Sequence, residues 1–173
     1  MRVKAVSRVL LILFIVGLNV SCDQVSKSIV RKNIHSWDRI EVIGSSLTLT
    51  KVENTGAFLS MGNTLSRPMK FIFLRLLPLC VLLLSLVYII IRKNLSIISS
   101  TAISFIIGGG IGNLYDRIIH GSVTDFMHID LGFLQTGIFN FADVSIMTGL
   151  FLILAEYMLM YSNLNQRIKN KPA

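Results

Sequence analysis

The sequence predicts an α-helical membrane protein with four transmembrane helices. Two compositional observations lead to this fold class: 53% of the 173 residues are hydrophobic, and only 15% are charged. Soluble domains of ordinary composition are more polar. The third observation is that the apolar residues gather in four runs, each close to the roughly 20 residues that an α-helix needs to cross about 30 Å of hydrocarbon. These runs are residues 8–26, 71–91, 97–114 and 138–161.

A soluble helical bundle and a nucleic-acid-binding protein are the alternatives to a membrane protein. A soluble bundle requires a polar face on each helix, and the stretch LLPLCVLLL at residues 76–84 has none. The net charge of +8 comes from lysines and arginines at segment ends and in loops, without a basic helix face or an aromatic platform. We therefore assign this charge to the flanks of membrane spans and expect no nucleic-acid partner.

An even number of crossings places both termini on one side of the membrane and two longer loops on the other. Lysines and arginines do not orient the chain, because eight lie on the terminal side and nine on the loop side. Eight of the nine acidic residues lie on or near the loop side, with only Glu156 towards the other end. The acidic residues therefore locate the expected chemistry at the loop side.

The first run ends in GLNVSCDQVSK (residues 17–27), which is similar to the cleavage site of a bacterial lipoprotein precursor. The apolar pattern continues past Cys22, and Asn19 stands where such a site has an aliphatic residue. We expect a retained helix, and a lipoprotein cut before Cys22 remains an alternative. Asp23 and Lys27 share one helix face, either as an interfacial anchor or as part of a site.

The loop over residues 33–66 predicts a short β-hairpin. Its apolar residues alternate with polar ones at 40–42 and again at 47–49, on either side of Gly44-Ser45-Ser46. Asn54-Thr55-Gly56 follows as a turn, in which the asparagine side chain accepts or donates local hydrogen bonds. Such a sheet, apolar on one face, would lie beside the membrane.

The third run ends in GGGIGNLYDRI (residues 108–118). Consecutive glycines lower helix propensity unless close packing compensates. Gly108 and Gly112 are four residues apart, the small-residue spacing that lets membrane helices pack backbone to backbone. We expect this helix to pack tightly and to deliver Asn113, Asp116 and Arg117 to the surface at the loop side.

Two further acids follow, Asp125 in the second loop and Asp143 at the start of the fourth run. Taken alone, Asp125 is typical of a solvated loop residue and Asp143 of an acid stabilised at a helix start. An ionisable group at membrane depth costs at least about 2.5 kcal/mol, so Asp143 requires a partner, water or a function. The polar residues that fall near the same membrane face are Asn113, Arg117, Asp125, Asn140 and Asp143.

Other catalytic chemistries find no matching pattern. His35, His120 and His128 do not form the two-histidine motif of zinc proteases, and no Gly-x-Ser-x-Gly motif occurs. Cys22 and Cys80 both lie in predicted spans, where a disulfide is unexpected and no base adjoins them. Chemistry of a carboxylate pair remains, and we expect no metal and no cofactor.

Five short motifs follow one another along the chain: DQVSK (23–27), NTGA (54–57), GNLYDR (112–117), VTDF (123–126) and FNFAD (139–143). In these motifs and their order the chain resembles the family of lipoprotein signal peptidase, or signal peptidase II, over essentially its whole length. One departure follows the second motif, where Phe58 and Leu59 replace the family's alanine and aromatic residue. This departure leaves the shape of the substrate groove beside the loop open.

The resemblance implies a four-helix aspartyl endopeptidase of the bacterial inner membrane, formed by one domain over residues 1–173. A small periplasmic β-cradle is expected at about 33–66, and a short periplasmic loop or helix at about 116–137. The resemblance also implies a periplasmic active site and cytoplasmic termini. The implied substrates are diacylglyceryl-modified prolipoproteins, cleaved before the lipidated cysteine. Contact with membrane lipid and inhibition by globomycin-type compounds are implied as well.

The resemblance assigns Asp125 and Asp143 to the catalytic dyad. It assigns eight further residues to the surroundings of the site: Asp23, Lys27, Asn54, Gly56, Asn113, Arg117, Asn140 and Ala142. Two carboxyl groups in a medium of low dielectric share a proton, so one activates water while the other hydrogen-bonds the scissile carbonyl. The sequence does not say which aspartate is protonated. A four-span transport or binding module with an acid pair also remains open, although the acids cluster at one face instead of crossing the bilayer.

Overall fold

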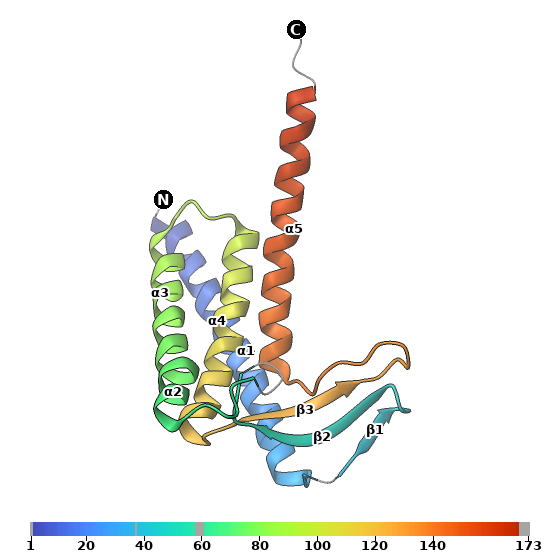
Figure 1. The fold of residues 1–173 in the computed structure, drawn as a ribbon. Coiled ribbons are helices and arrows are strands. Elements are labelled where there is room, and N and C mark those ends of the chain that lie inside the picture. Colours follow the sequence, from blue (N-terminus) through green and yellow to red (C-terminus); the bar gives the residue numbers. More distant parts are fainter. Residues whose placement is uncertain (1, 37, 58–60, 170–173) are drawn as a thin grey trace.

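The structure is a computed structural model that describes residues 2–36, 38–57 and 61–169, with side chains from residue 6 to residue 162 of these ranges. Figure 1 shows a helix bundle from one end of which a small sheet projects sideways, while both termini lie at the opposite end. The elements are α1 (Arg2–Asn33), β1 (Ile40–Ile43), β2 (Leu47–Asn54), α2 (Arg67–Phe71), η2 (Ile72–Leu76), α3 (Leu77–Ile91), α4 (Ile97–Ile119), β3 (Val123–Ile129) and α5 (Phe141–Lys169).

Four helical segments are long and apolar enough to cross a membrane, which confirms the predicted fold class. They are Val6–Asn33, Arg67–Ile91, Ile97–Ile119 and Phe141–Ser162. The second segment runs through α2, the π-helical turn η2 and α3. This turn ends two residues before Pro78, whose ring and missing N–H disturb the regular ladder of helical hydrogen bonds.

Two helices extend further than their apolar runs. α1 reaches Asn33 instead of ending near residue 26, because Val30 and the adjoining Ile34 pack on Phe126 of the sheet. α4 reaches Ile119 instead of ending near residue 114, because its polar Asn113 and Asp116 face the protein interior. Hydropathy assigns polar residues such as Asn113 and Asp116 to a loop, whereas in the folded protein both are buried.

The sheet differs from the expectation in one strand. β1 and β2 form the predicted hairpin, in which Ile40 pairs with Leu49 and Gly44 adopts a positive φ of 50° at the turn. The stretch expected as a loop or helix at 116–137 contributes β3, which pairs antiparallel with β2 and places Val52 opposite Asp125. The first four residues of β3 are all buried, so the strand lacks the alternation that marks a half-exposed strand.

The glycine-rich part of α4 makes this helix the centre of the bundle. A Cβ atom added at Gly108 would lie 2.7 Å from a side chain of α1, and one at Gly110 would lie 2.6 Å from a side chain of α3. At Gly109 it would meet the backbone of α5. Each glycine thus allows one neighbouring helix to approach, which confirms the packing expected from the small-residue spacing.

Candidate active site

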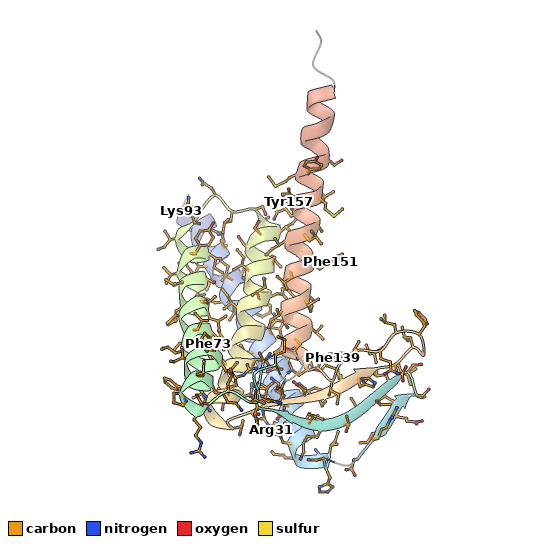
Figure 2. All side chains as sticks on the ribbon, viewed as in Figure 1. Arg31, Phe73, Lys93, Phe139, Phe151 and Tyr157 are labelled. Carbon is orange, nitrogen blue, oxygen red and sulfur yellow. The ribbon has the colours of Figure 1, made fainter. Side chains whose placement is uncertain are left out.

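The predicted polar residues come together where the sheet joins the helices. Figure 2 shows Phe139 at the foot of α5 beside the strands, with Lys93 at the opposite end of the bundle. The backbone of Phe139 pairs with Met127 in both directions, at 2.8 and 2.9 Å, so the segment before α5 is fastened to β3. This pairing brings the catalytic candidates of β3 and α5 into one place.

Asp125 lies on β3 and is 6% exposed. Its Oδ1 accepts a hydrogen bond of 2.6 Å from Nδ2 of Asn140, and its Oδ2 accepts one of 3.1 Å from Nδ2 of Asn54. Burial raises the pKa of Asp125 to about 6, and the nearby carboxylate of Asp143 adds to this rise, whereas the two amide donors act against it. Asp125 therefore holds a proton more readily than an ordinary aspartate.

Asp143 lies in the first turn of α5 and is half-buried. Its Oδ1 accepts from Nδ2 of Asn113 at 2.9 Å, and its Oδ2 accepts from the backbone N–H of Asn140 at 3.1 Å. Oδ1 of Asn140 in turn accepts from the backbone N–H of Asp143 at 3.0 Å, a reciprocal cap of the helix start. Asn140 thus binds both carboxyl groups, Asp125 with its side chain and Asp143 with its backbone.

The turn after β2 lies beside Asp125, to which Asn54 donates a hydrogen bond. Oδ1 of Asn54 accepts from the backbone N–H of Gly56 at 2.9 Å, as expected for an asparagine turn. Arg117 on α4 donates to the carbonyl oxygen of Gly56 at 2.8 Å, and both aspartates attract its guanidinium group. Arg117 therefore ties this turn to α4. The departure from the family at Phe58 and Leu59 lies outside the described residues.

A buried ion network lies behind the aspartates. Nζ of Lys27 contacts carboxylate oxygens of Asp23 at 2.8 Å and Asp116 at 3.2 Å, and all three side chains are fully buried. The same Nζ donates to Oδ1 of Asn113 at 3.0 Å. Arg31 contacts Asp116 at 2.7 Å, so two positive charges meet two negative ones and the network is neutral.

This network also reaches α5 and accounts for three predicted residues that do not touch either catalytic candidate through their side chains. Asp23 accepts from the backbone N–H of Ala142 at 2.9 Å, so α1 holds the first turn of α5 next to Asp143. Ala142 itself is completely buried. Asp23, Lys27 and Ala142 therefore position the site from behind.

Part of this network is not predicted from the sequence. Asp116 is expected at the surface, but it is fully buried and also accepts from the backbone N–H of Thr124, immediately before Asp125, at 3.3 Å. Nε of Arg31 donates to the hydroxyl of Thr124 at 2.8 Å. The signal that could have found the network is the spacing of Asp23, Lys27 and Arg31, an acid followed by two bases on one helix face.

The arrangement is suited to acid–base chemistry. A buried carboxyl group with a raised pKa lies next to a second carboxyl group that is held by hydrogen-bond donors, so the two can share one proton. Within residues 2–36, 38–57 and 61–169, no group of three or more histidine, cysteine, aspartate or glutamate side chains could hold a metal ion. The two carboxyl groups can act as a proton donor and a proton acceptor.

Comparison with known proteins yields one family. The family model described as Signal peptidase (SPase) II matches residues 15–159. Lipoprotein signal peptidase of Wigglesworthia glossinidia brevipalpis is 34% identical over 134 residues, which cover 76% of this chain and 83% of the relative. Lipoprotein signal peptidase of Staphylococcus aureus (strain Newman) is 33% identical over 146 residues, which cover 84% and 86%.

Solved structures of bacterial membrane enzymes share the fold. One has a TM-score of 0.77 and 31% identity, and the match covers 94% of this chain and 93% of that one. A second has a TM-score of 0.74 and 31% identity, with 84% and 91% covered. The sequence motifs, the membrane bundle and these comparisons lead to one conclusion: the chain belongs to the signal peptidase II family, and it is a multi-pass membrane peptidase.

Proposed function

We propose that this peptidase is an aspartyl endopeptidase that removes signal peptides from diacylglyceryl-modified prolipoproteins by cutting before the lipidated cysteine. The observation that carries the proposal is the link between Asp125 and Asp143 through Asn140. The relatives are named lipoprotein signal peptidase, which supports the substrate class. Asp125 and Asp143 form the dyad, and the other predicted residues position it.

The electrostatics favour one distribution of the shared proton. Asp125 is the more buried carboxyl group and keeps the proton, because burial disfavours its charged form. Asp143 lies in the first turn of α5, where Nδ2 of Asn113 and the backbone N–H of Asn140 hold its carboxyl group in place. Asp143 then accepts a proton from water as the water oxygen attacks the scissile carbonyl carbon, while Asp125 donates its proton to the carbonyl oxygen. When the C–N bond breaks, Asp143 gives the proton it took from water to the departing amine, one hydroxyl of the gem-diol returns a proton to Asp125, and no covalent enzyme intermediate forms.

The location of the site suits a lipid-modified substrate. The dyad lies at the end of the membrane bundle, so the diacylglyceryl chains can remain in the bilayer while the peptide enters beneath the turn at Gly56. The proposal includes an inner-membrane location, a periplasmic site and cytoplasmic termini. It also includes contact with membrane lipid and inhibition by globomycin-type compounds that occupy the peptide path.

The test is a gel-shift cleavage assay with purified enzyme in detergent. The substrates are a diacylglyceryl-modified prolipoprotein and its unlipidated form. Asp125→Asn and Asp143→Asn should each lower the cleavage rate by about 10³-fold or more, because each keeps the side-chain size and removes the titrating group. Asp130→Asn is the matched control, since Asp130 lies beyond β3 and contacts Gly132 instead of the dyad. Unchanged cleavage by either dyad variant would refute the mechanism, and cleavage of the unlipidated form at the same rate would refute the substrate assignment.

Orientation needs a separate measurement. Ser36 is exposed between α1 and β1, on the sheet side of the bundle. In a variant whose two natural cysteines, Cys22 and Cys80, are replaced by serine, Ser36→Cys should react with a membrane-impermeant maleimide added outside intact spheroplasts. Labelling only after lysis would place the sheet in the cytoplasm and overturn the proposed orientation.

A further inference from the structure

A cavity of about 320 Å³ lies at the end of the bundle that is remote from the dyad. It opens between residues 7–15 of α1 and the N-terminal part of α4, at the end that Figure 1 shows beside the N-terminus and Figure 2 marks with Lys93. A volume near 300 Å³ lies at the lower end of the range for small-molecule sites. The residues that the argument uses from its lining are Arg8, Leu11, Ile12, Ile15, Ser100 and Thr101.

Arg8 gives the mouth of this cavity a positive charge. Its Nη2 donates to the carbonyl oxygen of Ile89 at 2.9 Å and to the hydroxyl of Ser100 at 3.2 Å. Among the side chains that the structure describes, no carboxylate lies within ion-pair distance of Arg8, and its buried Nε has no hydrogen-bond partner there. Glu156, the acid at this end, instead accepts hydrogen bonds from Ser96 and Ser99 at the start of α4. Within the part of the chain whose side chains the structure describes, the charge of Arg8 therefore has no counter-ion.

The rest of the cavity is apolar along one wall and carries hydroxyl groups along the other. Leu11, Ile12 and Ile15 of α1 form the apolar wall, and Ser100 and Thr101 of α4 supply hydroxyls. The lining residues of α1 extend over nine positions, from Ser7 to Ile15, which corresponds to about 12 Å along the helix axis. The cavity thus runs from a charged group at the edge of a membrane span into the depth of the hydrocarbon.

We propose that this cavity binds an anionic glycerophospholipid from the leaflet next to the chain termini. The phosphate group pairs with Arg8, the hydroxyls of Ser100 and Thr101 face the glycerol region, and one acyl chain lies against the apolar wall between α1 and α4. Charge complementarity selects this occupant, because basic pockets between membrane helices bind anionic head groups. Bound there, the lipid connects α1 with α4. Arg8, which pairs with the phosphate, also donates to the carbonyl oxygen of Ile89 and so links the lipid to α3. The proposal is independent of the cleavage reaction.

Native mass spectrometry of the purified, delipidated full-length protein tests this proposal. The probes are phosphatidylglycerol, phosphatidylcholine with the same acyl chains, and glycerol 3-phosphate. The wild type should bind its first phosphatidylglycerol about fivefold more tightly than phosphatidylcholine, the preference expected from one basic residue. Arg8→Gln should abolish this preference, and Arg92→Gln should keep it, since Arg92 is exposed at the same end but does not line the cavity.

Three outcomes would overturn the proposal. Equal affinities of the wild type for both phospholipids would show that the acyl chain alone binds. Equal binding of glycerol 3-phosphate would show a site for free phosphate. The same preference in Arg8→Gln would place the anionic lipid elsewhere.

A second variant keeps the test decisive if Arg8→Gln does not fold. Leu11 is 46% exposed, so Leu11→Trp adds bulk at the cavity without entering the core. This variant keeps Arg8 and should weaken binding of both phospholipids by at least about fivefold, because the apolar wall no longer admits an acyl chain. Unchanged lipid binding by Leu11→Trp would remove the cavity from consideration.

Discussion

Replacement of Asn54 by leucine should extend the activity of the peptidase to higher pH. The amide of Asn54 donates a hydrogen bond of 3.1 Å to Oδ2 of Asp125, and this bond favours the ionised carboxylate. Leucine has a similar volume and no donor. Its introduction should therefore raise the pKa of Asp125 above the present value of about 6, so that the dyad keeps its shared proton to a higher pH.

The size of the shift follows from the geometry of this bond. A hydrogen bond to a charged group contributes about 1.5–3 kcal/mol, and a length of 3.1 Å places this one towards the lower end. One pKa unit corresponds to about 1.4 kcal/mol. The alkaline limb of the pH profile, where the shared proton is lost, should therefore move upward by about one pH unit.

The assay is the pH dependence of kcat/KM for a diacylglyceryl-modified peptide, measured from about pH 5 to about pH 9 in detergent. Thr55→Val is the matched control, because the Thr55 hydroxyl bonds to Asn63 at 2.9 Å and the residue lies in the same turn. Damage to the turn would lower kcat/KM at every pH without moving the limb. A limb that stays in place or moves downward in Asn54→Leu would refute the assignment of the alkaline limb to Asp125.

Two further predictions concern stability and packing. The pKa of Asp125 rises from 3.8 to about 6 on folding, so its contribution to the free energy of unfolding is complete below pH 3.8 and is lost as the pH rises through about 6. This loss amounts to about 3 kcal/mol and should be absent in Asp125→Asn. Unfolding titrations of both proteins at low and at high pH measure it, and an equal change in the free energy of unfolding with pH in the two proteins would contradict the prediction. A Cβ atom at Gly112 would meet the carboxylate of Asp23, so Gly112→Ala should cost about 1–3 kcal/mol of stability and displace the start of α5. Gly17→Ala is its control, because nothing lies within 4 Å of the added Cβ; equal melting temperatures and cleavage rates in the two variants would contradict the expectation.

Hydropathy and motifs predicted the membrane helices and the two aspartates, because both signals are local in the sequence. They could not predict β3, since the first part of this strand is buried on both faces and shows no alternation. They could not predict the extra turns of α1 either, because Val30 is shielded by a sheet residue more than ninety positions away. Asp116 was misplaced for the same reason: its partners on α1 and β3 become neighbours only in the folded chain.

The missed ion network accounts for the direction of one amide group in the site. Buried ion networks are weak evidence for stability, because apolar side chains of similar volume often replace them without loss. Apolar residues could not, however, orient Asn113. Its Oδ1 accepts from Nζ of Lys27 at 3.0 Å and from Nδ2 of Asn140 at 3.2 Å, so its Nδ2 is left to donate to Asp143. If the Asn113 amide were rotated by half a turn, its NH₂ group would face Nζ of Lys27 and its oxygen would face the Asp143 carboxylate. Lys27 is positively charged and has no acceptor, so it excludes that orientation. Lys27 therefore orients Asn113 towards Asp143, although Lys27 itself forms no hydrogen bond with either carboxyl group of the proposed dyad.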